Sequence, residues 1–289
     1  MAALLPTRIN NMKEENRMEA KAIYQNDYVV SSWEELCEEV YHDAWKPGMG
    51  RYRSDYAFRG LSDSSYELKN SFLRNCGSRP ELEYHLLRNF RKYSISKEAQ
   101  LSGSFWRALV MAQHHGLPTR LLDWTYSPFI AMHFATTNTE KYDLDGVIWK
   151  VDFVKANKLI SDPLHQKLLE EKCNAFTVEM LEENIQSLPD FEKVMGNNQV
   201  VFFEPPSMDE RIVNQFAFFS VMSNPTAILD EWLIKHPELY RRLIIPKELK
   251  WEVRDKLDQA NITERVLFPG LDGLAHWLKR HYKPASDLV

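Results

Sequence analysis

The spacing of apolar residues along the chain predicts a series of helices. Leu82, Leu86 and Phe90 fall on one face of a helix that starts at Pro80, because residues three or four apart share a helix face. Ser127 before a proline is typical of an N-cap and predicts the start of another helix. The predicted helices cover 82–90, 106–112, 129–136, 247–259 and 273–282.

Short runs of β-branched and aromatic residues predict strands between these helices. The predicted strands cover 55–59, 119–125, 146–152, 199–203, 217–221 and 239–245. A charge-rich stretch near 155–195 predicts a helical insertion. The mixed order of helices and strands predicts an α+β fold, with a central twisted mixed or antiparallel sheet and helices outside it.

The length of 289 residues suggests one large domain, preceded by an arm. Residues 1–28 are polar and weakly patterned and predict an N-terminal arm, and residues 29–289 predict the α+β domain. Ser32 and Glu35 have the spacing of a capping box at the first helix of that domain. The sequence shows neither the apolar core of a signal peptide nor a membrane-length apolar run, so a soluble cytoplasmic protein with no membrane partner is expected.

Charge and cysteine usage argue against several classes of protein. The formal net charge is -5, from 36 basic and 41 acidic side chains, so nucleic acid is not an expected partner. Cys37, Cys76 and Cys173 lie far apart and form no CxxC pair. This pattern argues against a zinc ribbon and a disulfide scaffold, and favours a reducing compartment.

Arg59 is the first candidate for chemistry, because it ends an apolar strand. Gly60 follows at once and would let the backbone come close to a ligand. A guanidinium group offers paired hydrogen bonds to phosphate. The alternative is a structural ion pair with an acid such as Asp63 or Asp123, and the sequence leaves both interpretations open.

The stretch 113–125 is the second candidate, because it sets polar side chains around a Gly-Leu-Pro turn between two predicted helices. His114 and His115 stand at a helix C-terminus, where the helix dipole favours protonation of an exposed histidine. Adjacent histidines point in different directions and no third ligand has recognisable spacing, so no metal is expected.

The same stretch carries four further residues, and three of them have two interpretations each. Arg120 and Asp123 belong either to a ligand site or to a buried ion pair that locks the turn. Trp124 belongs either to the core or to a stacking platform for a planar ligand, and Thr125 follows it at the strand end.

Arg211 and Gln215 form the third candidate, four residues apart before the predicted strand 217–221. Gln215 would lie at the mouth of that strand. The alternative is that its amide satisfies loose backbone groups.

The triplet Phe58-Arg59-Gly60 and the motif between His114 and Trp124 together resemble the FRG-domain family, along residues 29–279. Proteins of this family are common in prophage and phage-defence settings, and the resemblance implies such a setting here. It is carried most specifically by these two motifs.

The order of the elements resembles, more weakly, the ADP-ribosyltransferase superfamily. Arg59 matches its strand-borne arginine, and Ala131-Met132-His133-Phe134-Ala135 matches its AxxFA helix. Thr125 alone is retained from the Ser/Thr motif, and Gln215 stands where the catalytic glutamate belongs. The resemblance implies a sheet split around a cleft that Arg59, Asp123 and Gln215 approach together.

The implied function is a nucleotide-handling enzyme that acts on NAD or a related dinucleotide, with a nucleotide ligand and a protein target as partners. One alternative is a non-catalytic module that binds a nucleotide signal or a protein, and a third is a nuclease. The expected catalytic residues are Arg59, His114, His115 and Gln215. The expected substrate-binding residues are Phe58, Gly60, Arg120, Asp123, Trp124, Thr125 and Arg211.

Overall fold

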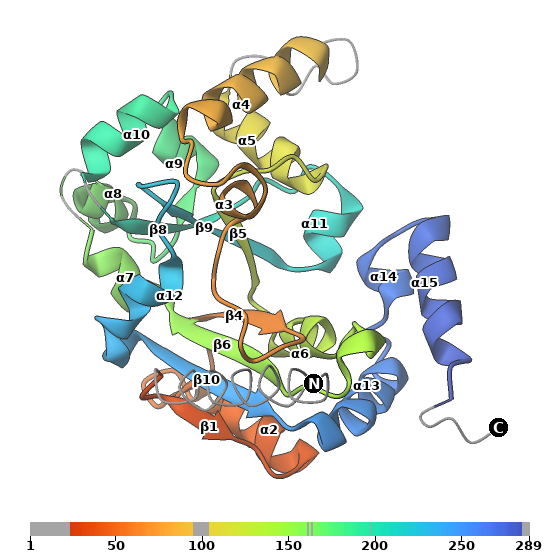
Figure 1. The fold of residues 1–289 in the computed structure, drawn as a ribbon. Helices are drawn as coiled ribbons and strands as arrows, with labels where there is room; N and C mark the ends of the chain where they lie inside the picture. Colours follow the sequence, from red (N-terminus) through yellow and green to blue (C-terminus); the bar gives the residue numbers. More distant parts are fainter. Residues whose placement is uncertain (1–23, 95–103, 161, 163, 197, 285–289) are drawn as a thin grey trace, which may run out of the picture.

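The computed structural model describes residues 24–94, 104–160, 162, 164–196 and 198–284 (Figure 1). An eight-stranded mixed sheet runs through this part of the chain in the order β1-β10-β6-β4-β5-β9-β8-β7. The β1–β10 and β7–β8 pairs are parallel, and the others are antiparallel. The strands are β1 Asp27–Val29, β4 Tyr56–Leu61, β5 Leu121–Thr125, β6 Gly146–Asp152, β7 Phe176–Thr177, β8 Val200–Glu204, β9 Ala217–Met222 and β10 Tyr240–Ile245. The predicted α+β fold with a large mixed sheet is confirmed.

The sheet consists of two halves that meet at one residue pair. β4 pairs with β6 along its whole length, and β5 pairs with β9 along its whole length. Between β4 and β5 only Phe58 and Thr125 are paired. Beyond this pair, the residues from Arg59 onward on β4 and those before Thr125 on β5 are not paired with each other. We call this unpaired junction the β4/β5 split.

Helices pack around both halves (Figure 1). None of the described helices is long and apolar enough to cross a membrane. A small hairpin, β2 Trp45–Lys46 with β3 Arg51–Tyr52, lies outside the main sheet. The helices are α2 Trp33–Tyr41, α3 Ser71–Cys76, α4 Glu81–Ser94, α5 Phe105–His114, α6 Pro128–Thr136, α7 Phe153–Lys158, α8 Leu164–Glu171, α9 Val178–Glu182, α10 Leu188–Met195, α11 Glu210–Asn214, α12 Leu229–Ile234, α13 Lys250–Gln259, α14 Glu264–Leu267 and α15 Leu271–His281.

The predicted elements are present, with ends that shift by a few residues, and the exceptions are short. The insertion near 155–195 is helical but also holds the two-residue strand β7. The predicted arm boundary after residue 28 falls inside β1, which pairs with β10, while residues 1–23 lie outside the described part. Ser32 caps the amide of Glu35 at 3.1 Å, yet the Glu35 carboxylate turns to the amide of Ser31. The capping box is thus shifted by one residue.

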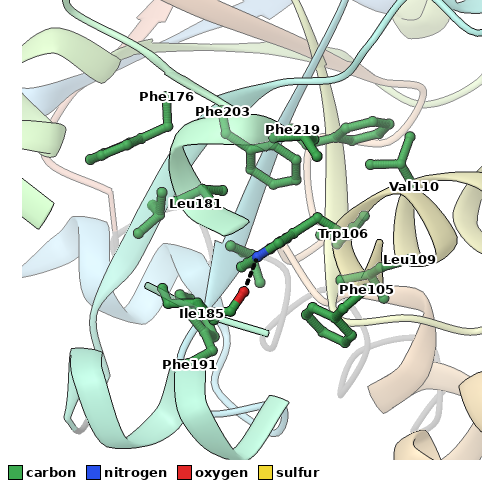
Figure 2. Packing of buried hydrophobic residues seen from close by; sticks show 14 of the residues in the cluster. Phe105, Trp106, Leu109, Val110, Phe176, Leu181, Ile185, Phe191, Phe203 and Phe219 are labelled. Carbon is green, nitrogen blue, oxygen red and sulfur yellow. Dashed lines mark hydrogen bonds between the residues drawn. The ribbon is translucent and has the colours of Figure 1, made fainter. Parts of the chain in front are cut away.

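A hydrophobic core fixes α5 against β8 and β9 (Figure 2). At its centre Trp106 is fully buried and donates from Nε1 to the backbone oxygen of Ile185 at 2.9 Å. Its ring meets Phe191 and Phe203 edge to face, each at 5.5 Å between ring centres. Aromatic rings in this arrangement gain attraction beyond burial alone. The C-terminus of α5, which carries Gln113 and His114, is therefore held by a rigid base.

A buried polar cluster joins α6 to α13 on the other half of the molecule. Arg254 donates to Nδ1 of the fully buried His133 at 2.7 Å. A guanidinium has no acceptor, so Nδ1 accepts and the ring proton lies on Nε2, 3.0 Å from Thr137 Oγ1. His133 is therefore neutral in the fold.

This neutral histidine is expected to make the protein less stable in mild acid. Burial, reinforced by the charge of Arg254, lowers the pKa of His133 to about 3, whereas an unfolded histidine titrates near ~6.5. Between these values only the unfolded chain binds the proton, so the free energy of unfolding falls by up to ~1.4 kcal/mol per pH unit as pH drops.

Denaturant unfolding from about pH 7 to about pH 5 measures this effect against His133→Gln. Glutamine keeps an acceptor for Arg254 and does not titrate, so the native protein should lose stability more steeply. Parallel pH profiles for the two proteins would contradict the assignment.

Candidate functional site

Arg59 lies on β4 next to the single pair that joins the two halves of the sheet. Its side chain is 16% exposed, and Nη1 donates one hydrogen bond to the backbone oxygen of Asp123. The Asp123 carboxylate lies 3.9 Å from Nη1, too far for a hydrogen bond. The Nε atom of Arg59 is buried without a partner. Among the described residues, this cation uses only one of its five N–H donors.

The charge of Arg59 is poorly compensated. Burial lowers the pKa of its guanidinium, the nearby Asp123 opposes that shift, and the positive charge of Arg74 adds to it. Of the two acids proposed as structural partners from the sequence, Asp63 instead bonds to Ser65. A buried cation with open donors is costly unless something else supplies the acceptors.

Other buried arginines of the chain donate more side-chain hydrogen bonds than Arg59, which donates one. Each of the four donates at least three side-chain hydrogen bonds: Arg120, Arg242, Arg254 and Arg280. Their contacts account for them as structural residues, although the Nε atoms of Arg242 and Arg254 are also buried without a partner. Arg59 differs because its side chain donates a single hydrogen bond among the described residues.

The alternative interpretation of Arg120 and Asp123, a buried ion pair between them, is wrong. Arg120 Nε bonds Glu83 at 2.7 Å, and Nη2 bonds Glu192 at 2.8 Å. Residues three apart along an extended segment point to opposite faces, so Arg120 turns into the core and Asp123 turns out. Arg120 is 2% exposed and lies within the protein interior.

Gln113, at the end of α5, holds the Asp123 carboxylate. Its Nε2 lies 3.1 and 3.0 Å from the two carboxylate oxygens, and its Oε1 accepts from Thr119 Oγ1 at 2.6 Å. Both ends of the amide are thus occupied. The carboxylate is kept beside Arg59 without closing onto it, which leaves the guanidinium donors open. Gln113 is absent from the predicted site residues, although its place beside His114 at the end of a helix could have suggested it.

His114 lies on the other side of the α5 C-terminus and faces α11. Its Nε2 is paired with the carboxylate of Asp209, whose other oxygen caps α11 by accepting from the amide of Ile212 at 2.9 Å. His115 is exposed, with its ring edge-on to that of His114. His114 is therefore the histidine that a carboxylate orients, while His115 is open to solvent. In the sequence, Asp209 was recognisable only as an acid in the stretch before the predicted strand 217–221.

Arg211 borders the same corner. Its Nη1 lies 3.4 Å from the backbone oxygen of His114, and its guanidinium stacks over Phe268 at 4.9 Å. Its Nε is buried without a partner. Arg59 and Arg211 thus lie on the two flanks of the α5 C-terminus, and both retain unused donors.

Gln215 is the C-cap residue that follows α11, and its side chain points toward α14. The amide Nε2 donates to the backbone oxygen of Leu267 at 3.0 Å. Its own backbone oxygen accepts from Thr125 Oγ1 at 2.8 Å, which ties it to the end of β5. This contact fits the alternative interpretation from the sequence, an amide that satisfies a backbone group. Gln215 therefore lies near the strand end, with its amide engaged by the backbone of α14.

Three predicted ligand contacts lie in the interior. Phe58 is 1% exposed, and Trp124 and Thr125 are 3% exposed. The Trp124 indole donates to Ser220 Oγ at 2.9 Å and packs against Phe202. Of the two interpretations of Trp124, the core position is the observed one.

Gly60 brings β4 and α6 into close contact. A Cβ atom placed there would lie 1.8 Å from the backbone oxygen of Ala131 and 2.7 Å from the backbone nitrogen of Ala135. The space that the missing side chain leaves is filled by helix backbone. The expected reason for this glycine, close approach of a ligand, is therefore wrong for this face of the strand.

The segment that contains these features matches a known family. A model of the FRG domain matches residues 54–144. The chain contains an FRG domain. This FRG domain begins just before β4 and ends just before β6, so it includes both strands of the split, the α5 C-terminus and α6. Comparison with curated proteins and with solved structures gave no match.

The FRG domain supplies one flank of the site, and the later chain supplies the other. Arg59, Gln113, His114 and Asp123 lie inside the matched segment. The α11 residues come from outside it and meet it through His114. Within the described ranges, no group of three or more His, Cys, Asp and Glu side chains is placed to hold a metal ion.

Proposed function

We propose that the β4/β5 split binds the phosphate groups of a nucleotide, and that the protein is a nucleotide-handling enzyme of the ADP-ribosyltransferase type that acts on NAD or a related dinucleotide. The observation that carries the proposal is the Arg59 guanidinium, which is largely buried and uses one donor. A phosphate group offers several anionic acceptors in the geometry that a guanidinium fork matches. Binding would supply both the missing charge and the missing hydrogen bonds.

His114 supports the catalytic part of the proposal. A histidine paired with a carboxylate is held in one orientation and can carry a proton to or from a bound group. In the proposed enzyme Arg59 holds the pyrophosphate and His114 is the proton donor. The proposed phage-defence or prophage setting and a protein acceptor rest on the family resemblance alone.

The second candidate function is a non-catalytic module, in which the same site binds a nucleotide without converting it. Gln215 favours it, because the residue at the expected glutamate position is uncharged and its amide is engaged with Leu267. An oriented carboxylate next to developing positive charge is a large part of catalysis in such sites. Glu210, the acid closest in sequence, is exposed in the first turn of α11.

Incubation with NAD tests the two candidates. The enzyme should release nicotinamide, measured by chromatography, and Arg59→Ala should abolish the release. Arg59→Lys keeps the charge but loses the paired geometry and should retain only a small part of the activity. Arg88→Ala, on the exposed side of α4, is the matched control and should leave the rate unchanged.

Calorimetry with NAD completes the experiment. Binding that depends on Arg59, with no nicotinamide released, would favour the module. Neither binding nor turnover in the native protein would refute the proposal for this dinucleotide, and release that survives in Arg59→Ala would refute the role of the arginine.

A further inference from the structure

A second arginine lies on the first helix after β4 and has no carboxylate partner among the described residues. Arg74 is exposed on α3, the first helix after β4, and its Nη1 donates to the backbone oxygen of Lys69. Lys69 is paired with Glu67 at 2.5 Å, whereas no acid of the described residues pairs with Arg74. The charge of Arg74 is therefore available.

Hydrogen bonds fix α3 to Thr119, two residues before β5 begins. The amide of Phe72 donates to the backbone oxygen of Thr119 at 2.9 Å. Ser71 Oγ exchanges hydrogen bonds with the same residue at 3.0 and 3.1 Å. Thr119 in turn bonds Gln113, which holds Asp123 beside Arg59. In Figure 1, α3 is drawn directly over β5.

The N-terminus of α3 is also held in place by hydrogen bonds. Asn70 caps the helix by accepting from the amide of Leu73 at 2.7 Å. The Asn70 side chain is itself fixed by a bond to the backbone oxygen of Pro225 at 2.9 Å. A charged side chain on such a helix acts from a defined place, which favours binding over long-range attraction.

We propose that Arg74 and Arg59 together form an anion site for a diphosphate group, in which Arg59 makes the buried contacts and Arg74 closes the site from the solvent side. This inference rests on the proposed function, because it names the part of the ligand that the split would hold. Two guanidinium groups with one nearby carboxylate leave an excess of positive charge. That excess suits a ligand with at least two negative charges, and Gln113 prevents Asp123 from cancelling it.

The mutual repulsion of the two arginines points the same way. The positive charge of Arg74 helps to lower the pKa of Arg59, after the larger effect of burial. An anion between the two groups would screen this repulsion and would also offset the free-energy cost of burying the Arg59 charge.

Titration calorimetry with inorganic pyrophosphate tests the site on the intact protein. The native protein should bind pyrophosphate at one saturable site. Arg74→Ala should weaken the affinity about tenfold, the loss expected for one charge-assisted hydrogen-bonding partner. Arg74→Lys should recover part of that loss. Arg88→Ala removes the same charge from an exposed helix elsewhere and should leave the affinity unchanged.

Each outcome decides the inference. No pyrophosphate binding by the native protein, or equal affinity in Arg74→Ala, would overturn it. An equal loss in Arg88→Ala would also overturn it, because net charge alone would then account for binding. Nicotinamide release is measured separately. Arg74-dependent pyrophosphate binding without any binding or cleavage of NAD would refute the proposed function and leave the anion site standing.

Discussion

Replacing Gly60 by alanine is expected to destabilise the protein by about 3 kcal/mol or more, the upper range for overpacking a tight core. The new Cβ would lie 1.8 Å from the backbone oxygen of Ala131, closer than any real contact. Neither the strand nor the helix can move freely, because β4 is paired along its length with β6 and α6 is packed on both. The clash therefore has to be relieved by displacing main chain.

Denaturant unfolding measures this loss as a lower free energy of unfolding. The matched control is Gly48→Ala, where a Cβ meets no atom within 4 Å and the backbone has no positive φ. That substitution should change stability by less than ~0.5 kcal/mol. A Gly60→Ala protein as stable as the control would show that α6 does not rest on β4 as described.

Replacing Arg120 by methionine is expected to cost about 3–5 kcal/mol, the range for removing one partner of a buried ion pair. Glu83 is 1% exposed, and Arg120 supplies hydrogen bonds to both of its oxygens, from the amide and from Nε. Burial raises the pKa of Glu83, and Arg120 opposes that shift. Without the arginine the carboxylate would remain buried without its partner charge, or would have to take up a proton.

Two comparisons make this measurement specific. Lys46→Met breaks an ion pair with Asp55 whose members are each about one-third exposed, and it should cost less than ~1 kcal/mol. The double variant Arg120→Met with Glu83→Leu should recover part of the loss, because no charge is left unpaired. The deficit of Arg120→Met alone should also shrink as pH falls and Glu83 becomes protonated. Equal costs for Arg120→Met and Lys46→Met would contradict the assignment.

The Gly60 contact also gives a physical reason for the third residue of the Phe-Arg-Gly triplet. Phe58 and Gly60 face α6, one as core and the other as the point of closest approach. Arg59 between them points to the opposite face, since side chains alternate along a strand. The triplet thus combines two packing residues with one residue available for binding.

The sequence by itself determined the long elements of this protein. Runs such as 146–152 and 217–221 carry a strand signal within themselves, because β-branched and aromatic side chains on both faces require burial. Ser127 followed by a proline marked the start of α6, and its hydroxyl caps that helix as expected. Strands β1 and β7 carried no such signal, because a segment of two or three residues becomes a strand only through pairing with an adjacent strand.

Only the tertiary structure decided what each polar residue of the motifs does. Arg59 and Arg120 are both arginines beside apolar runs, and no local pattern separates them. Arg120 donates three side-chain hydrogen bonds, two of them to Glu83 and Glu192 on distant helices, whereas Arg59 donates one, to a backbone oxygen. The balance of charge and hydrogen bonds around a buried cation is set by residues far away in the sequence. The chain therefore identified its candidate residues locally, and the fold alone distinguished the structural ones from those with open donors.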